Sequence, residues 1–581
     1  MRSDPELTPF SIDPQTSHFM KNTTLTLLGQ PQINEFYEKG NWQDHTLYAL
    51  ARSHALSKPN SFAIQDRERR LTYAQLIDAA DVLADKLYRD GVRDGQRVGV
   101  WMPSRVETAI ALLACSRNAY MCCLSLHRDH TVADIVNLME RSKASAFIAE
   151  RAYGADAQRH DIFEALQSVK SLRSTVALES VKATAQTGQS LKEALGASIE
   201  DQSASVAPST DPNRVIYLAY TSGTTGVPKG VMHSDNTLLA NARAMAHDWH
   251  FTNASVIYTL SPLSHNLGLG ALVVALLSGG ELVVHDLDKN TSLLDRILGI
   301  QATFLFGVPT HAIDLLAELQ ERGIASLGSL QGFRISGASV PQELVAKLLS
   351  YGVKPQSGYG MTEGCSHHYT LPSDEPKRII ETSGRACAGY EVRIFSTDNP
   401  EQELPIGEIG QIGARGASLM LGYFNDQLAT EEAFNQSGWF MTGDLGLLDA
   451  EGYIVITGRK KDLIIRGGHN IYPSRIENLA LQHPLVLRAA VLPVPDARLG
   501  EKVCLAVMTR AGPELKANDL LSHLDQAGLS RYDMPEYYLE LPEIPLTASG
   551  KIYKRDMAQD IKLGKLKPLA VRFEPLDKVN T

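Results

Sequence analysis

The sequence is short of cysteine, of long apolar runs and of positive charge. Its six cysteines form no CxxC pair and no metal-ligand spacing, so we expect reduced thiols in a cytoplasmic protein. The longest apolar run, residues 268–277, is about half the length of a bilayer span, which predicts no transmembrane segment. Asp4, Pro5 and Glu6 stand where a signal peptide would be basic and then apolar. The net charge of −10 argues against nucleic acid as the main partner.

A chain of 581 residues, 44% of them hydrophobic, can bury more than one core. Residues 75–87 have apolar side chains at helical spacing, and residues 98–102 form a strand-like apolar run. Such segments alternate through most of the chain, which predicts a layered α/β fold. Glycines spaced among short apolar runs after residue 405 predict a small β-rich subdomain.

A basic, glycine-bearing stretch at residues 458–468 marks the clearest domain boundary. We therefore predict an irregular N-terminal extension over residues 1–43, a large domain over 44–458 and a small C-terminal domain over 459–581.

The most informative segment is residues 220–230, Tyr-Thr-Ser-Gly-Thr-Thr-Gly-Val-Pro-Lys-Gly, which follows a strand-like run. Its backbone N–H groups, hydroxyls and lysine are suited to hold a polyphosphate. It is not a Walker A loop, because Pro228 and not glycine precedes Lys229. The alternative is an ordinary Gly/Thr-rich turn. The phosphate-binding candidates are Thr221, Ser222, Gly223, Thr224, Thr225, Gly226 and Lys229.

Two further motifs have the chemistry of a nucleotide site. Gly358-Tyr-Gly-Met-Thr-Glu363 offers the aromatic face of Tyr359 to a purine, with glycines that let a flat ring approach the backbone. Thr442-Gly-Asp444 offers a carboxylate that can accept hydrogen bonds from ribose hydroxyls. Taken singly, each motif is as typical of a strand turn or a turn aspartate.

In this order, the motifs resemble those of the acyl-adenylate-forming superfamily, the AMP-dependent synthetases and ligases. The resemblance covers about residues 44–556, and the chain is most similar to acid–CoA ligases for cyclic (cyclohexanecarboxylate-type), aryl or medium-chain acids. It implies a large N-terminal domain of layered α/β subdomains with a small β-barrel-like subdomain. It also implies a small, mobile α+β C-terminal domain with a hinge near Lys461. The expected ligands are ATP, Mg²⁺, coenzyme A and a small carboxylic acid, bound by a monomer or homodimer.

The resemblance assigns roles to individual residues. Tyr359 would stack on adenine, Thr362 would contact the α-phosphate and Glu363 would hold Mg²⁺. Lys551, at the end of Pro545-Leu-Thr-Ala-Ser-Gly-Lys551, would reach over the site. A cation there offsets the repulsion between the attacking carboxylate and the phosphate. The other nucleotide-binding candidates are Gly337, Ala338, Gly358, Gly360, Met361, Asp444 and Arg459.

His265-Asn266 lies where the superfamily borders the acyl pocket, and His265 is also a catalytic candidate. Leu267 stands where dihydroxybenzoate-activating relatives have tyrosine, which favours a less polar ring or an alkyl group. Further lining candidates are Phe306, Gly307, Ser336, Gly337, Ala338 and Gly360. For CoA the candidates are Gly467, Gly468 and His469, although many relatives carry glutamate at position 469. Residues 124–127 replace a proline-containing stretch of the relatives, a departure expected to alter only local packing.

The activity implied is that of an AMP-forming acid–CoA ligase. A carboxylate and ATP give an acyl-adenylate and pyrophosphate, and the CoA thiolate then takes the acyl group. Two alternatives stay open: a stand-alone adenylating enzyme that loads a carrier protein, and a non-catalytic nucleotide-binding sensor. Lys551, Glu363 and Asp444 are all present, which disfavours the sensor.

Overall fold

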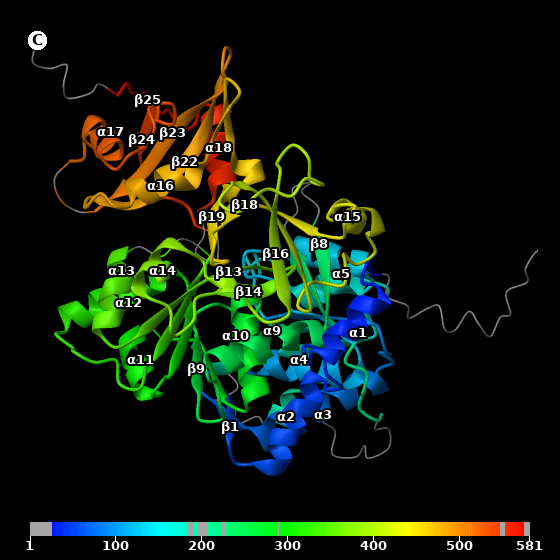
Figure 1. Ribbon diagram of the computed structural model, residues 1–581. Helices are drawn as coiled ribbons and strands as arrows, with labels where there is room; N and C mark the ends of the chain where they lie inside the picture. The colour runs from blue at the N-terminus through cyan, green and yellow to red at the C-terminus, as the bar shows by residue number, and fades with distance from the viewer. Residues whose placement is uncertain are drawn as a thin grey trace, which may run out of the picture.

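The computed structural model describes residues 26–182, 191–195, 206–221, 228–288, 290–337, 340, 342–510, 512, 514–546 and 552–573. A large body holds three sheets, and a smaller body that carries the C-terminal part of the chain lies above it (Figure 1). The predicted α/β class, with a large N-terminal and a small C-terminal domain, is confirmed.

The first sheet of the large domain has nine strands in the order β15-β14-β13-β12-β11-β9-β10-β1-β2. The strands from β13 to β1 in this order run parallel. At the two edges, β2 pairs antiparallel with β1, β14 with β13 and β15 with β14. The carboxyl ends of β11, β12 and β13 therefore meet at one edge, where α/β sheets bind ligands. The bounds are β1 (Phe62–Gln65), β2 (Arg70–Thr72), β9 (Val256–Thr259), β10 (Glu281–Val284), β11 (Phe304–Gly307), β12 (Gly332–Ser336), β13 (Lys354–Met361), β14 (Cys365–Tyr369) and β15 (Arg385–Ala386).

The second sheet has six strands in the order β6-β5-β3-β4-β7-β8, parallel except for the antiparallel pair β7–β8. The strand predicted over residues 98–102 is β3, displaced by one residue. The pair β7–β8 flanks the predicted phosphate loop. The bounds are β3 (Arg97–Trp101), β4 (Met121–Cys123), β5 (Ala146–Glu150), β6 (Ser174–Leu178), β7 (Val215–Thr221) and β8 (Lys229–Ser234).

Helices fill the space between these two sheets. Every residue of α4 (Val106–Asn118) is buried, and this helix contacts β3, β4 and β7. The apolar run of residues 268–277 lies in α10 (Asn266–Ser278), which contacts β9, β10, β11 and β14. It is therefore a core helix. Among the residues that the structure describes, no helix is long and apolar enough to cross a bilayer.

The helix predicted over residues 75–87 is α3, Tyr73–Arg89, and Thr72 caps it by accepting a hydrogen bond from the backbone N–H of Gln75. The other helices of the large domain are α2 (Leu47–Ser57), α5 (Val132–Ser142), α6 (Ile162–Ala165), the 3₁₀ turn η3 (Leu166–Ser168), α8 (Leu191–Ala194), α9 (Asp235–Asp248), α11 (Leu293–Gly299), α12 (Pro309–Glu321), α13 (Gln342–Ser350), α14 (Pro376–Glu381) and α15 (Gln427–Glu432).

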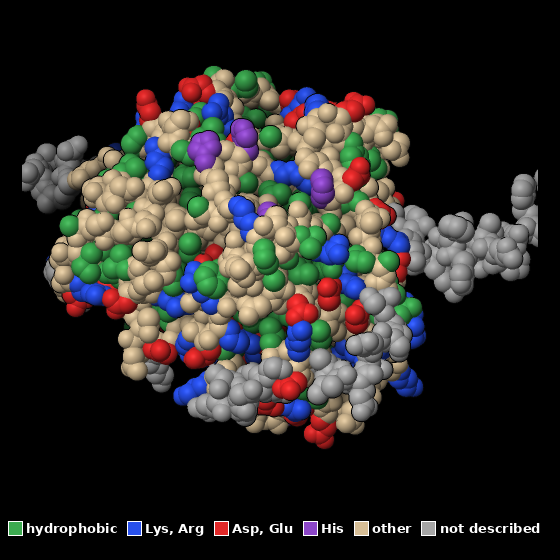
Figure 2. All heavy atoms as spheres, turned by 90° about the horizontal axis from the view of Figure 1, so that it is seen from below, with side chains coloured by type: hydrophobic (Ala, Val, Ile, Leu, Met, Phe, Trp, Pro, Cys, Tyr) green, Lys and Arg blue, Asp and Glu red, His purple; other side chains and the backbone are tan. Residues whose placement is uncertain are grey.

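The predicted β-rich subdomain is the third sheet, four antiparallel strands in the order β16-β17-β18-β19. Its strands are β16 (Tyr390–Phe395), β17 (Gly410–Gly416), β18 (Phe440–Leu448) and β19 (Ile454–Arg459). The face of the large domain that points away from the small domain carries acidic and basic side chains interspersed (Figure 2).

A 3₁₀ turn, η4 (Lys460–Asp462), connects β19 to the small domain and contains the predicted hinge residue Lys461. The small domain is a sheet in the order β21-β20-β23-β24-β25, with β22 paired to β23. Its elements are β20 (Ile464–Arg466), β21 (His469–Ile471), α16 (Pro473–Ala480), β22 (Val486–Asp496), β23 (Gly500–Thr509), α17 (Ala517–Gln526), β24 (Tyr537–Glu540), α18 (Lys554–Lys562) and β25 (Leu569–Ala570).

The prediction of an irregular N-terminal extension is wrong for residues 30–38, which form helix α1 (Gln30–Glu38). Pro31 stands in the first turn, where its missing N–H costs no hydrogen bond. Phe36 and Trp42 are buried against the large domain, and the Trp42 indole donates a 2.8 Å hydrogen bond to the Ala417 carbonyl. This tertiary packing, which the local sequence does not reveal, stabilises the helix.

Candidate functional site

The predicted adenine and ribose residues lie together where β13 meets the four-stranded sheet. The Tyr359 hydroxyl donates a 2.7 Å hydrogen bond to Asp444 Oδ2. Asp444 and Arg459 are register partners on β18 and β19, and Arg459 Nε lies 3.3 Å from Asp444 Oδ1. Burial, followed by the charge of Asp444, holds the Tyr359 pKa well above its ordinary value, so this hydroxyl keeps its proton and remains a donor.

The two described ends of the phosphate loop face each other across a strand pair. Thr221 at the end of β7 is the register partner of Lys229 at the start of β8. Ser222, Gly223, Thr224, Thr225 and Gly226 lie outside the described residues, as do Ala338 and Lys551. The geometry of the β7–β8 pair thus fixes where the predicted loop begins and ends.

Lys229 and Glu363 both lie against the side chain of Tyr423. The Tyr423 hydroxyl donates a 3.1 Å hydrogen bond to Glu363 Oε1, and Lys229 Nζ lies 4.8 Å from the centre of the Tyr423 ring. Burial raises the pKa of the Glu363 carboxyl, while the Tyr423 hydrogen bond and the Lys229 charge oppose that shift. The loop lysine and the predicted metal carboxylate are therefore brought to one place.

The backbone of Thr362 is held by a buried histidine. Nε2 of His233 donates a 2.7 Å hydrogen bond to the Thr362 carbonyl, and Nδ1 lies 3.0 Å from Thr237 Oγ1. Burial lowers the pKa of His233 to about 4, so the ring is neutral at physiological pH. This contact fixes the end of the Gly358–Glu363 motif.

The acyl motif is joined directly to the nucleotide motif. His265 is the residue before α10, and Asn266 is the first residue of that helix. The Asn266 side-chain amide donates a 3.1 Å hydrogen bond to the Met361 carbonyl at the end of β13. The His265 ring stacks on that of His127, with centroids 4.0 Å apart and planes 18° apart. The substituted stretch at residues 124–127 therefore packs against a candidate site residue.

The remaining acyl candidates stand at the carboxyl ends of parallel strands. Gly307 ends β11, and Ser336 at the end of β12 donates a 2.9 Å hydrogen bond to the Gly358 carbonyl. Gly337 has a φ of +95°, a conformation that favours glycine. A Cβ on Gly360 would lie 2.2 Å from the Cys365 carbonyl oxygen, so the chains there approach closely. Phe306, 1% exposed, packs in the core with its ring centroid 5.4 Å from that of Phe304.

The CoA candidates lie in the small domain. Gly467 and Gly468, with φ of 58° and 86°, form the turn between β20 and β21. The side chain of His469, which is 52% exposed, has Nε2 2.8 Å from Asp533 Oδ1. The structure thus pairs His469 with an acid of its own domain.

Comparison with known proteins agrees with this arrangement. Residues 51–424 match the AMP-binding enzyme family, and residues 475–551 match the AMP-binding enzyme C-terminal domain. The chain belongs to the AMP-binding enzyme family. The resemblance to acyl-adenylate-forming enzymes is thereby confirmed, and so, at the level of the family, is an ATP-dependent acid–thiol ligase.

Relatives of this AMP-binding enzyme cover nearly all of it. The medium-chain fatty-acid–CoA ligase of Escherichia coli strain K12 is 30% identical over 544 residues, 93% of this chain and 95% of that protein. Enterobactin synthase component E of the same strain is 30% identical over 535 residues, 90% of this chain and 96% of that protein. Among solved structures, ATP-bound MatB from Rhodopseudomonas palustris has a TM-score of 0.76 at 27% identity, covering 89% of this chain and 99% of that one.

Three contacts of this AMP-binding enzyme were missed by reasoning from sequence. His233, Tyr423 and His127 each touch a candidate site residue, yet none was among the predicted site residues. Two signals were available: His233 follows the phosphate loop by only a few residues, and His127 ends the stretch 124–127 that departs from the relatives. Tyr423 and His127 reach the site from loops distant in sequence.

Proposed function

We propose that this protein is an AMP-forming acid–CoA ligase for an apolar alicyclic, aromatic or medium-chain monocarboxylic acid. The observation that carries the proposal is that strand β13 contacts both the nucleotide motifs and the acyl motif. Tyr359 on this strand contacts the ribose candidate Asp444, and two residues on, the Met361 carbonyl binds Asn266 of the acyl motif. An acid and a nucleotide bound to these motifs would therefore have their carboxylate and α-phosphate side by side.

The residues suit the chemistry of adenylate formation. Lys551 would bridge the carboxylate and the α-phosphate, which offsets their mutual repulsion in the transition state. Thr362 would donate to the α-phosphate, and Lys229 would contact the other phosphates. The CoA thiolate would then attack the acyl carbon of the adenylate and expel AMP, with no covalent intermediate on the enzyme.

The residues around Glu363 fit a bound Mg²⁺. Within the described ranges, no group of three or more carboxylates, imidazoles or thiols could enclose a metal by itself. Mg²⁺ usually takes one or two carboxylates together with substrate phosphates, and Glu363 beside Lys229 offers such a carboxylate. When bound, the ion would neutralise part of the phosphate charge.

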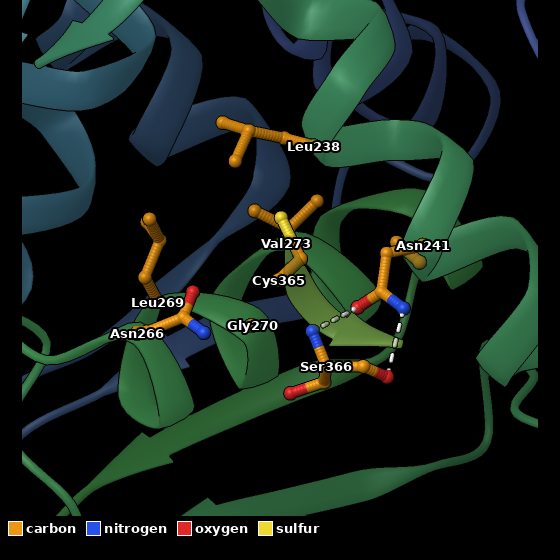
Figure 3. A pocket seen from close by; sticks show the side chains of 9 residues that line it. Leu238, Asn241, Asn266, Leu269, Gly270, Val273, Cys365 and Ser366 are labelled. Atoms are coloured by element: carbon orange, nitrogen blue, oxygen red, sulfur yellow. Dashed lines mark hydrogen bonds between the residues drawn. The ribbon is translucent and has the colours of Figure 1, made fainter. Parts of the chain in front are cut away.

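A small cavity lies next to Asn266 of the acyl motif and bears on which acids the enzyme would accept. It lies between α9, α10 and β14, has a volume of about 10 Å³, and is lined by Leu238, Asn241, Ala242, Asn266, Leu269, Gly270, Val273, Cys365 and Ser366 (Figure 3). Asn241 is engaged with the backbone N–H and carbonyl of Ser366. A Cβ on Gly270 would meet no atom within 4 Å. A cavity of this size holds about one water molecule, so it marks only the direction, toward Gly270, in which we propose that an apolar acyl end points.

The relatives carry names of different kinds, so both the acid and the acceptor need a direct test. One is named a medium-chain fatty-acid–CoA ligase, and another is a component of the enterobactin synthase. Pyrophosphate release and thioester formation should therefore be measured over a panel of carboxylic acids, with and without CoA. Pyrophosphate with a CoA-dependent thioester supports the ligase. An adenylate that is never transferred to CoA would indicate a carrier-protein acceptor, and ATP binding without turnover would indicate a sensor.

The cavity is tested by a matched pair of variants. Gly270→Val should shift the preferred acid to one shorter by one or two carbons, because each buried methylene is worth about 0.8 kcal/mol, or about fourfold in kcat/KM. Gly299→Val is the control, since Gly299 at the end of α11 also has no atom within 4 Å of its Cβ. An unchanged ranking of acids in a folded Gly270→Val enzyme would show that the acyl end does not reach this cavity.

A further inference from the structure

We propose that His127 is a positioning residue that holds the imidazole of His265 at the border between the acyl and nucleotide motifs. The inference rests on the proposed function, since it assigns a role within that site. The two rings are nearly parallel, with centroids 4.0 Å apart and planes 18° apart. Such contact over a full ring face restricts how far the His265 ring can turn.

His127 is itself held by one contact of its ring and two of its backbone. Its Nδ1 lies 3.0 Å from the hydroxyl of Ser264, its backbone N–H donates to Nδ1 of His130 over 3.1 Å, and its carbonyl accepts a 3.0 Å hydrogen bond from the Trp101 indole. Trp101 is fully buried on β3. The loop between β4 and α5 therefore offers a rigid surface to His265.

Hydrogen bonds also hold the chain on both sides of His265. Ser264, one residue before, meets His127, and Asn266, one residue after, is bound to the Met361 carbonyl. One neighbour of His265 is therefore bonded to the loop between β4 and α5, and the other is bonded to β13. Fixing it in this way keeps its imidazole in one place when a substrate arrives.

The charge state of His127 suits a stacking role. Burial lowers its pKa to about 4, and the neighbouring His130 adds to that effect. The ring is therefore neutral at physiological pH and places no charge against the His265 ring. Its contribution to the site is the flat face, which a phenyl ring would also supply.

The test compares His127→Ala with His127→Phe, alone and with His265→Ala. His127→Ala should lower the kcat of adenylate formation by about 10- to 100-fold with little change in the KM for ATP, because the displaced ring no longer meets the reacting groups. His127→Phe should restore most of that loss. In the His265→Ala background, His127→Ala should have no further effect, since a residue that acts through another is non-additive with it.

Three results would overturn the assignment. The first is an equal loss of kcat in folded His127→Phe and His127→Ala. The second is a further loss of kcat when His127→Ala is added to His265→Ala. The third is an unmoved His265 ring in a crystal structure of His127→Ala. The crystal structures also separate this inference from the proposed function. If the wild type forms no adenylate with any acid, the proposed function fails, and a displaced His265 ring in His127→Ala still supports the positioning role.

Discussion

Asp235 gives the structure a predictable dependence of stability on pH. This side chain is fully buried at the start of α9. Its Oδ1 accepts hydrogen bonds from the Leu47 N–H at 2.8 Å and the Ser116 hydroxyl at 2.9 Å, while Oδ2 is buried with no hydrogen-bond partner among the described residues. Burial raises the Asp235 pKa to about 7, and the two donors reduce that shift.

The sign and size of the effect follow from linkage. The folded pKa of about 7 lies above the ordinary aspartate pKa of 3.8, so the folded state holds the proton more tightly than the unfolded state. This stabilisation is complete below the unfolded pKa and is lost as pH rises through the folded pKa. Between about pH 5.5 and about pH 8, the loss amounts to about 2 kcal/mol in the free energy of unfolding.

The variant Asp235→Asn should abolish this component. Its amide oxygen can accept the same two hydrogen bonds, and it has no proton to lose. We expect the stability of the large domain, measured by denaturant unfolding at the two pH values, to fall by about 2 kcal/mol less in Asp235→Asn than in the wild type. Asp398→Asn, at an exposed loop position, is the control for the change in charge and should follow the wild type.

Equal pH dependence in the wild type and in folded Asp235→Asn would refute the reasoning, because it would mean that Asp235 has similar pKa values folded and unfolded. A larger fall in Asp235→Asn would contradict the sign. Circular dichroism at both pH values would establish that each variant is folded before the comparison.

Three further substitutions test the site, and a fourth, Gly270→Ala, is the control for one of them. Lys551→Ala should suppress adenylate formation by about 10²- to 10³-fold and leave thioester formation from supplied acyl-AMP largely intact; equal loss of both half-reactions would contradict its role. Tyr359→Phe keeps the ring but removes the 2.7 Å hydrogen bond to the ribose candidate Asp444. The KM for ATP should therefore rise about 10-fold with kcat little changed. An unaltered KM would mean that this hydrogen bond does not contribute to nucleotide binding. Gly360→Ala should weaken ATP binding in calorimetry, because its methyl would lie 2.2 Å from a backbone carbonyl of β14. Gly270→Ala, whose methyl meets no atom within 4 Å, should bind ATP normally.

The sequence was most informative where a local pattern specifies structure. Apolar spacing located α3 to within two residues at each end, and the strand-like run at 98–102 located β3. The resemblance to the superfamily predicted that Tyr359, Asp444 and Arg459 belong to one site, and the structure places Tyr359 and Arg459 in contact with Asp444.

Contacts between distant loops could not be predicted in this way. The stacked residues His127 and His265 are 138 positions apart in sequence. Tyr423 and Glu363, which share a hydrogen bond, are 60 positions apart. No periodicity or turn signal encodes such contacts, because they depend on how the sheets pack. Helix α1 was missed for a similar reason, since its stability comes from Phe36 and Trp42 docking on the large domain.

The shared strand β13 limits how the acid specificity of this enzyme can be redesigned. If the proposed function holds, a side chain changed between Gly358 and Met361 alters the binding of the nucleotide together with that of the acid. The helices α9 and α10 supply most of the lining of the small cavity, from positions outside the motifs that contain Asp444 and Arg459. Variation in the acid accepted should therefore be sought at positions such as Leu238, where activation by ATP can be left undisturbed.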